Sequence, residues 1–440
     1  MDPQALDVLR ADNPWLDGSA RPVFQLPAGF ISRTVMEDLN AGMATRDRVH
    51  LVVGPRQVGK STLIRRYFQA ASAPPLYLDC EQRVVRELCA SAPLFLELVR
   101  QIAPATTPIY FDEVQHLHEA ALFLKGLVDR CPGVTLVATG SSSYHLRSAT
   151  RESLAGRATR TRVLPFSLAE VTADVSTRPP LIREAQARER LAKHLRFGGY
   201  PRAWLDPRPE VVLAELVEAL VLRDASDLHR VGRPDAFRRL MVLVAGQVGS
   251  LVNHSEWASL LGVNRDTVAS YLQILEDSHL CFTLPPFAAG KRAEVTGRPK
   301  VFFVDVGLRN RLVGDFRPFE ERVDRGAVAE QWVFGELQKA LPTDATLHFW
   351  RSAGGAEMDF VVVRGDQLVA IEVKAGLAGT RTSLTRSARS FIDAYSPREL
   401  WVIHGSGVAS TSTVGETCVK HIPMVELLRD PLQLERALGP

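Results

Sequence analysis

Short apolar runs alternate with longer amphipathic segments through the first third of the chain. The runs lie at about residues 49–53, 75–79, 108–112, 134–139 and 161–166. An apolar run of this length is typical of a buried strand, and strands that alternate with helices favour a parallel α/β sheet. The ligand site of such a sheet lies at the carboxyl ends of its strands. A helix is also expected before the first run, at about residues 32–40.

The pattern changes after about residue 170, where helical stretches rich in Arg and Glu predict a lid or linker. Further along, Gly262 is expected to end one helix and Asn264 to cap the next, whose buried stripe includes Val268 and Leu272. These features predict a helix-turn-helix. The expected organisation is an N-terminal lead-in (1–45), an α/β core (46–170), a helical lid or linker (171–235), a winged helix-turn-helix (236–312) and a C-terminal α/β domain (313–440).

Composition and charge describe an ordinary globular protein. The chain has 440 residues, of which 46% are hydrophobic and 23% charged, and its net charge of +3 is too small to indicate nucleic-acid binding by itself. The five cysteines form no CxxC pair, which favours reduced thiols over disulfides or a zinc site. No apolar run approaches the roughly 20 residues that span a bilayer, and no secretory signal pattern is visible. A cytoplasmic location is therefore expected.

A glycine-rich loop follows the first apolar run and leads into a helical stretch. Its residues are Gly54, Pro55, Arg56, Gln57, Val58, Gly59, Lys60 and Ser61, followed by Thr62. In a strand, loop and helix of this kind, backbone N–H groups and the helix N-terminus bind phosphate oxygens. Lys60 would neutralise the β- and γ-phosphates, and the Ser61 hydroxyl would bind Mg²⁺. The loop therefore predicts ATP and Mg²⁺ as cofactors.

Two carboxylates, Asp112 and Glu113, end the third apolar run. Beside the loop, Asp112 would hold Mg²⁺ through water, and Glu113 would polarise the attacking water. The fourth run ends in hydroxyl side chains, of which Thr139 and Ser141 either contact the γ-phosphate or are ordinary strand-end residues. The set predicts a Mg²⁺-dependent ATPase with Lys60, Asp112 and Glu113 as its catalytic groups.

These motifs resemble a prokaryotic group of AAA-type P-loop ATPases that carries a C-terminal domain of unknown function. The likeness extends to the segments Leu154–Arg157, Val163–Glu170, Gly198–Pro201 and Leu222–Asp224, and so covers nearly the whole chain. It implies an ATP-hydrolysing switch. Within it, Arg157 or Arg223 would be an arginine finger at the bound nucleotide, in one chain or across a homo-oligomer interface, or else an ordinary salt-bridging arginine.

The helix-turn-helix leaves two roles open. Its outward-facing residues would be Arg265, Thr267 and Ser270, and a basic wing between strands at about 281–284 and 300–304 would carry Lys291, Arg292, Arg298 and Lys300. In the first role, the helix and the wing contact DNA bases and phosphates. In the second, the module is a lid or an assembly surface of the ATPase.

A second set of charged residues lies near the C-terminus. Glu330 is expected on a helix at about 325–337, Asp359 at the head of a strand, and Glu372 and Lys374 on one face of the next strand. Asp359 and Glu372 would hold Mg²⁺ beside a scissile phosphate, and Lys374 would orient water or neutralise charge. The set resembles the PD-(D/E)XK nuclease superfamily, although Met358 stands where the superfamily name has proline.

That resemblance implies a restriction-endonuclease-like C-terminal domain and leaves two functions open. In one, an ATP-driven switch controls a C-terminal domain that binds or cleaves nucleic acid. In the other, the chain is a nucleotide-responsive DNA-binding or scaffold protein whose nuclease-like domain is inactive.

Overall fold

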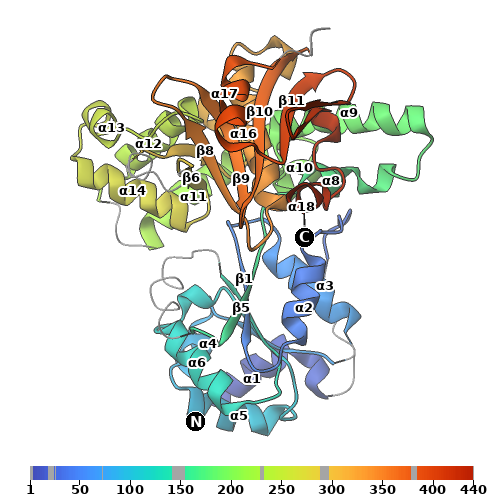
Figure 1. The fold of residues 1–440 in the computed structure, drawn as a ribbon. Coiled ribbons are helices and arrows are strands. Elements are labelled where there is room, and N and C mark those ends of the chain that lie inside the picture. The colour runs from blue at the N-terminus through green and yellow to red at the C-terminus, as the bar shows by residue number, and fades with distance from the viewer. Residues whose placement is uncertain are drawn as a thin grey trace. The chain divides into compact units, whose positions relative to one another are not determined.

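The computed structural model describes residues 3–17, 24, 26–71, 73–140, 154–227, 232–287, 297–377 and 384–439 (Figure 1). The chain divides into two compact units. The first comprises Met1–Leu164 with Asp277–His279, and the second comprises Pro165–Glu276 with Leu280–Pro440. Within the described ranges, every helix is too short or too polar to cross a membrane.

A five-stranded parallel sheet forms the centre of the first unit, with the strand order β2-β3-β4-β1-β5. Its strands are β1 (Val49–Val53), β2 (Leu76–Asp79), β3 (Ile109–Asp112), β4 (Leu136–Gly140) and β5 (Ala158–Arg162). The parallel α/β core expected from the apolar runs is therefore confirmed. Because β1 pairs with β4 on one side and β5 on the other, the loop after Val53 leaves the sheet between two strands.

Helices cover this sheet because their apolar side chains pack against it (Figure 1). They are α1 (Pro3–Asp12), α2 (Met36–Ala44), α3 (Lys60–Ala70), α4 (Arg83–Leu88), α5 (Ala92–Ile102) and α6 (Ala120–Arg130), with short 3₁₀ turns at Pro14–Asp17 and Val114–His116. Phe95 of α5 and Phe123 of α6 lie 5.7 and 5.6 Å from the ring of Phe111 in β3. The helix expected at about 32–40 begins later, so that Glu37 and Asp38 occupy its first turn, where carboxylates favour the helix dipole.

The position of the fifth strand differs from the prediction. β5 comprises Ala158–Arg162 and pairs with β1 in register from Ala158 to Arg162, whereas the apolar run lies at 161–166. β5 is an edge strand that needs only one buried face, and Thr161 is buried while Arg160 and Arg162 are exposed. Val163 and Leu164 are buried after β5 has ended. These two residues are therefore apolar because the segment after the strand is buried, and not because they belong to the strand.

His50 in β1 predicts a pH-dependent loss of stability. Its Nδ1 and Nε2 lie 2.7 and 3.1 Å from the hydroxyls of Thr159 and Thr161, and burial lowers its pKa to about 4 from an ordinary 6.5. As the pH falls, His50 takes up a proton in the unfolded chain before it does so in the folded chain. The contribution of neutral His50 to the free energy of unfolding is therefore fully present above pH 6.5 and is lost as the pH falls toward 4. We expect a loss of about 1–2 kcal/mol at pH 5.

Urea titrations at pH 7.5 and pH 5 measure that loss, and His50→Gln supplies the comparison because glutamine keeps a polar side chain but does not titrate. The fall in the unfolding midpoint should be smaller in the variant. An equal fall in both proteins would exclude His50 as the titrating group.

The second unit begins with helices that surround a small hairpin. They are α8 (Leu168–Thr172), α9 (Pro180–Phe197), α10 (Pro201–Leu205), α11 (Pro209–Asp227), α12 (Pro234–Gly246), α13 (His254–Leu261), α14 (Arg265–Asp277) and α15 (Val306–Val313), with a 3₁₀ turn at Ala173–Val175. Gly262 ends α13 with φ 65°, and the Asn264 side chain accepts a hydrogen bond from Thr267 N at 2.6 Å. Strands β6 (Cys281–Leu284) and β7 (Lys300–Phe303) then pair antiparallel. The expected wing residues Lys291 and Arg292 lie outside the described residues.

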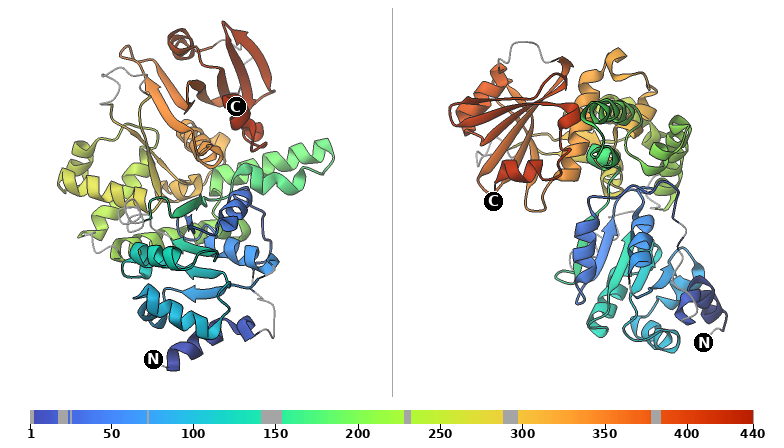
Figure 2. Two further views of the ribbon diagram at one scale, coloured as in Figure 1. Left: turned by 60° about the horizontal axis from the view of Figure 1, so that its bottom comes forward. Right: turned by 90° about the vertical axis from the view of Figure 1, so that its right-hand side faces the viewer.

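A six-stranded mixed sheet completes the second unit, with the strand order β12-β13-β11-β10-β9-β8 (Figure 2). Its strands are β8 (Thr346–Arg351), β9 (Glu357–Arg364), β10 (Gln367–Leu377), β11 (Glu399–Ser406), β12 (Ser410–Val414) and β13 (Thr417–Pro423). Its helices are α16 (Arg325–Ala340), α17 (Arg386–Tyr395) and α18 (Gln433–Leu438), with 3₁₀ turns at Phe319–Glu321 and Met424–Glu426. Phe391 of α17 packs in a core with Met358 and Leu400 of the sheet, and Phe334 of α16 packs against Phe360 of β9.

Candidate nucleotide site and C-terminal carboxylate cluster

The loop after β1 has a backbone that only glycine fits at its first position. Gly54 has φ 153°, and a Cβ there would lie 2.0 Å from the carbonyl oxygen of Val163. Gly59 has φ 91° and precedes α3, whose first intrahelical bond runs from Leu63 N to Gly59 O at 2.9 Å. The N–H groups at the start of α3 therefore face the loop, which is the arrangement that binds phosphate.

Lys60 lies across this loop. Its side chain is buried, and Nζ donates to the carbonyl oxygens of Gly54 and Pro55 at 3.0 and 2.9 Å. Val58 is fully buried, while Gln57 is exposed and has φ 60°. The ammonium is thus held inside the loop, where phosphate charge would be compensated.

Asp112, at the end of β3, gathers donors from several elements. Ser61 Oγ donates to Asp112 Oδ1 at 2.8 Å, and the Thr139 hydroxyl donates to the same oxygen. Tyr77 Oη donates to Oδ2 at 3.4 Å, and Arg65 Nη2 lies 3.7 Å from it. A hydroxyl in contact with a carboxylate is a set of hard oxygen donors that suits Mg²⁺.

Glu113 occupies a strained backbone position beside this pair. It has φ 54° and ψ 49°, and its N–H donates to Thr139 Oγ1 at 3.0 Å. The amide of Gln115 donates to its carboxylate. Burial opposes ionisation of Glu113, but the Lys60 charge, this hydrogen bond and the Arg56 charge outweigh it and lower its pKa. The carboxylate is therefore ionised at neutral pH.

The remaining predicted nucleotide contacts fall in different places. Thr62 lies in the first turn of α3, and Ser141 lies outside the described residues. Arg157 pairs with Asp129 at 2.8 Å, and its carbonyl accepts from Val49 N at the start of β1. The phosphate loop leaves the other end of β1, a strand length of about 16 Å away at 3.3 Å per residue. Arg157 therefore lies far from the nucleotide site of its own chain.

The other finger arginine, Arg223, is on α11, in the part whose side chains are not described. Gln115, Tyr77 and Arg65 were not anticipated from the sequence, because no motif spacing marks them. Their roles depend on which strands and helices are neighbours.

The C-terminal residues predicted together do lie near one another. Lys374 Nζ contacts Glu372 Oε1 at 2.6 Å, which agrees with side chains on one face of a strand. Asp359 Oδ2 accepts from Val373 N at 2.7 Å, and Thr385 Oγ1 donates to Glu372 Oε2 at 3.0 Å. Burial raises the pKa of Asp359, and the nearby Glu372 carboxylate adds to this rise.

Lys300 belongs to this cluster, and its assignment to a solvent-facing basic wing is wrong. It is 3% exposed, and Nζ lies 2.6 Å from Glu357 Oε1 and 3.1 Å from Glu330 Oε1. The reason is the packing of β7 against α16, where Phe302 stacks on Phe334 with ring centroids 4.3 Å apart. Side chains two residues apart share a strand face, so Lys300 points the same way as Phe302.

Burial raises the pKa of Glu330 to about 7, with the Lys300 charge opposing the rise. In this arrangement protein donors engage all the carboxylates of the cluster, which are Glu330, Glu357, Asp359 and Glu372. Among the residues that the structure describes, no three His, Cys, Asp or Glu side chains form a group that could hold a metal ion.

A local irregularity in β9 helps to aim Asp359. Trp350 of β8 pairs with Met358, whereas His348 pairs with Val361, so β9 carries one extra residue between these two pairs. A bulge of this kind changes the face to which side chains point, and such bulges are frequent next to active sites. The sequence gives no signal for it.

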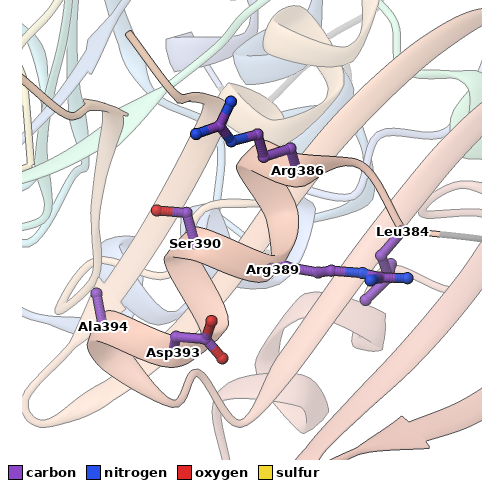
Figure 3. Close-up of a pocket in the computed structure, with 6 residues that line it drawn as sticks. All are labelled: Leu384, Arg386, Arg389, Ser390, Asp393 and Ala394. Atoms are coloured by element: carbon purple, nitrogen blue, oxygen red, sulfur yellow. The ribbon is translucent and has the colours of Figure 1, made fainter. Parts of the chain in front are cut away.

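A groove of about 670 Å³ lies along α17 (Figure 3). Its lining residues are Leu384, Arg386, Arg389, Ser390, Asp393 and Ala394. Thr385, beside Arg386, connects this helix to the carboxylate cluster through its bond to Glu372. The charged residues of this lining are two arginines and one aspartate.

Comparisons with known families divide the chain into three matched segments. Residues 46–172 match an AAA domain. Residues 188–318 and 325–424 match two separate domains of unknown function, DUF8612 and DUF4143.

The chain is also similar to whole proteins. An uncharacterized protein of Mycobacterium tuberculosis is 28% identical over 393 residues, covering 86% of this chain and 82% of that protein. An uncharacterized protein of Haemophilus influenzae is 25% identical over 348 residues, covering 74% of this chain and 82% of that protein. Among solved structures, a Walker-type ATPase of Pyrococcus abyssi is 16% identical with a TM-score of 0.44, covering 67% of this chain and 99% of that one.

A further solved structure, a STAND protein with a tetratricopeptide repeat sensor from Pyrococcus horikoshii, is 12% identical with a TM-score of 0.29, covering 72% of this chain and 47% of that one. The AAA-domain match coincides with the parallel sheet, the phosphate loop and the Asp112–Glu113 pair. Residues 46–172 therefore form a P-loop ATPase core that matches the AAA domain, and the two segments after it match domains of unknown function.

Proposed function

We propose that this protein is a Mg²⁺-dependent ATPase that uses ATP binding and hydrolysis as a switch. The observation that carries the proposal is the contact between Ser61 Oγ and Asp112 Oδ1 at 2.8 Å, with Lys60 and Glu113 beside it. Phosphate binding, metal binding and water activation each have a suitable group at this edge of the sheet.

Each residue has a definite task in this proposal. The N–H groups of the loop and of the α3 N-terminus bind the phosphates, and Lys60 neutralises charge that builds up on them. Ser61 and Asp112 would hold Mg²⁺, which stabilises charge between the β- and γ-phosphates when bound. Glu113 orients the attacking water and accepts its proton, since its carboxylate is ionised.

Replacing Glu113 with glutamine tests the proposal. The amide keeps the size of the side chain but accepts no proton, so we expect phosphate release to fall by about 10²- to 10⁴-fold while ATP binding persists. Phosphate release under single-turnover conditions and binding of a fluorescent ATP analogue measure the two quantities. Glu119→Gln is the matched control. It makes the same chemical change six residues further along the chain, at the start of α6. A wild-type rate of phosphate release in the Glu113 variant would contradict the assignment of Glu113 as the general base.

A second candidate function concerns the C-terminal domain. The proximity of Asp359, Glu372 and Lys374 supports metal-dependent action on a nucleic-acid phosphodiester, and Glu330 lies in the same cluster. In the alternative, these residues only stabilise a domain that binds DNA or assembles with other copies. The exposed Arg265 and Ser270 of α14 are available for DNA under either reading.

Cleavage assays separate these readings. Labelled single- and double-stranded DNA and RNA are incubated with the full chain and Mg²⁺ or Mn²⁺, with and without ATP. If the cluster is catalytic, we expect Asp359→Asn to reduce cleavage by at least about 100-fold without changing ATP hydrolysis. Equal residual cleavage by wild type and variant would favour the inactive, DNA-binding or scaffold reading.

A further inference from the structure

Two segments that the nucleotide chemistry leaves unexplained, Val163–Glu170 and Gly198–Pro201, meet at a buried point where Phe166 lies beside Gly199. Phe166 N donates to Gly199 O at 2.7 Å. The carbonyl of Phe166 accepts from His194 Nε2 at 2.8 Å and from Lys339 Nζ at 3.0 Å. The backbone just after the ATPase sheet is therefore held by side chains of α9 and α16.

A buried ion pair on α16 extends this attachment. Glu336 is 2% exposed; its Oε2 accepts from Leu168 N at 2.8 Å and its Oε1 pairs with Lys339 at 2.8 Å. His194 Nδ1 accepts from Trp332 Nε1, also on α16, at 2.8 Å. Ser167 and Glu170 form a capping box that fixes the start of α8.

Gly198 and Gly199 pack closely against this segment and against Asp305. A Cβ at Gly199 would lie 2.2 Å from Phe166 O, and one at Gly198 would lie 2.0 Å from Asp305 Oδ1. Asp305 also accepts from Gly199 N at 2.7 Å. A displacement of residues 166–168 must therefore be shared by the helices that hold them, because close-packed interiors transmit strain.

The residues just before this point are attached to the phosphate loop. Val163 N donates to Val53 O at 2.8 Å, and the Val163 carbonyl packs against Gly54. Arg33, which is 7% exposed, donates to the carbonyl of Val58 at 3.1 Å and also to the carbonyl of Leu164. One guanidinium thus joins the middle of the phosphate loop to Leu164, the residue that ends the first stretch of the first unit.

Only Pro165 separates these two sets of attachments. Leu164 ends the first stretch of one unit, and Pro165 begins the other. The ring of Pro165 fixes its φ, so this residue has one rotatable backbone dihedral fewer than any other residue would have here. The covalent path from the phosphate loop to residues 166–168 therefore runs through Leu164 and this one residue.

We propose that residues 163–168 transmit the nucleotide state of the phosphate loop to α16, with Arg33 as the positioning residue that joins the loop to Leu164. The inference rests on the proposed ATP binding. The loop must arrange its backbone around phosphate, and Val58 O, which Arg33 holds, is part of that backbone. α16 also carries Glu330, about 9 Å along the helix from Glu336 at 1.5 Å per residue. The C-terminal carboxylate cluster is therefore within reach of this motion.

Hydrogen–deuterium exchange on the full chain, with and without Mg²⁺ and a non-hydrolysable ATP analogue, tests the proposal. In the wild type we expect the analogue to change exchange in peptides covering 163–168 and 325–340, by about fivefold or more. Insertion of two glycines after Leu164 lengthens the connection and leaves the described hydrogen bonds on either side available. It should retain analogue binding and lose the change in 325–340.

Insertion of two glycines after Gly365, in the exposed turn between β9 and β10, is the matched control and should behave as wild type. Arg33→Met should reduce the response of 325–340 at saturating analogue. A full response in the Leu164 insertion variant, or none in a wild type that binds the analogue, overturns the transmission. A wild type that fails to bind the analogue overturns the proposed function and the transmission with it.

Discussion

Replacement of Lys60 with alanine is expected to weaken ATP binding by at least about 30-fold. The Lys60 ammonium is buried inside the phosphate loop, where it donates to the carbonyls of Gly54 and Pro55. With phosphates bound, the ammonium would neutralise their charge, and removal of one partner from a buried charge pair costs about 2–5 kcal/mol. That loss corresponds to a dissociation constant raised by at least about 30-fold, and by several thousandfold at the upper end.

Titration calorimetry with ATP and Mg²⁺ measures this effect, and circular dichroism checks that the variant is folded. Lys420→Ala is the control, because Lys420 pairs with Glu399 in the C-terminal sheet and has no part in the loop. Wild-type affinity in a folded Lys60→Ala protein would contradict the nucleotide site proposed for this loop.

Replacement of Lys300 with methionine should destabilise the second unit by about 3 kcal/mol. Methionine keeps the length and apolar contacts of the side chain but leaves Glu330 and Glu357 without their cation. Breaking a buried ion pair from one side costs about 3–5 kcal/mol. The lower end of that range applies because the Glu357 side chain is 34% exposed and water can reach it.

Urea unfolding followed by tryptophan fluorescence measures the change, with the transition of the second unit analysed separately. Lys420→Met is the matched control, since the Lys420 side chain is 35% exposed and pairs with Glu399. It should cost less than about 1 kcal/mol. Similar losses in the two variants would mean that the position of Lys300 between two carboxylates adds nothing to stability.

The strand, loop and helix of the candidate nucleotide site could be predicted because their signals are local in sequence. A strand, a loop with Gly54 and Gly59 and the start of a helix lie within one short stretch, and each follows from backbone geometry or periodicity. The position of Asp112 and Glu113 at the end of an apolar strand was predicted in the same way. The pairing of Glu372 with Lys374 followed from the two-residue period of a strand.

The rest depends on contacts between distant parts of the chain. Lys300 is the first residue of an apolar strand, and from the sequence alone it was predicted to lie in an exposed wing. Its burial depends on Glu330 of α16 and Glu357 of β9, which are distant in the sequence. Arg33 donates a hydrogen bond to the carbonyl of Leu164, which is 131 residues away in the sequence, and no local sequence pattern predicts that bond. The shift of β5 has a related cause, because the apolar run at Val163 marks burial outside the sheet.

The attachment of Phe166 and Leu168 to the second unit decides where that unit can be separated from the ATPase domain. The AAA-domain match ends at residue 172, which suggests a cut just beyond it. A fragment that starts there would lack the carbonyl that His194 and Lys339 bind and the N–H that Glu336 binds. Each buried polar group left without a partner costs about 1–3 kcal/mol. Recombinant expression of the C-terminal half should therefore begin at Pro165, so that the chain keeps the eight residues that a family boundary would discard.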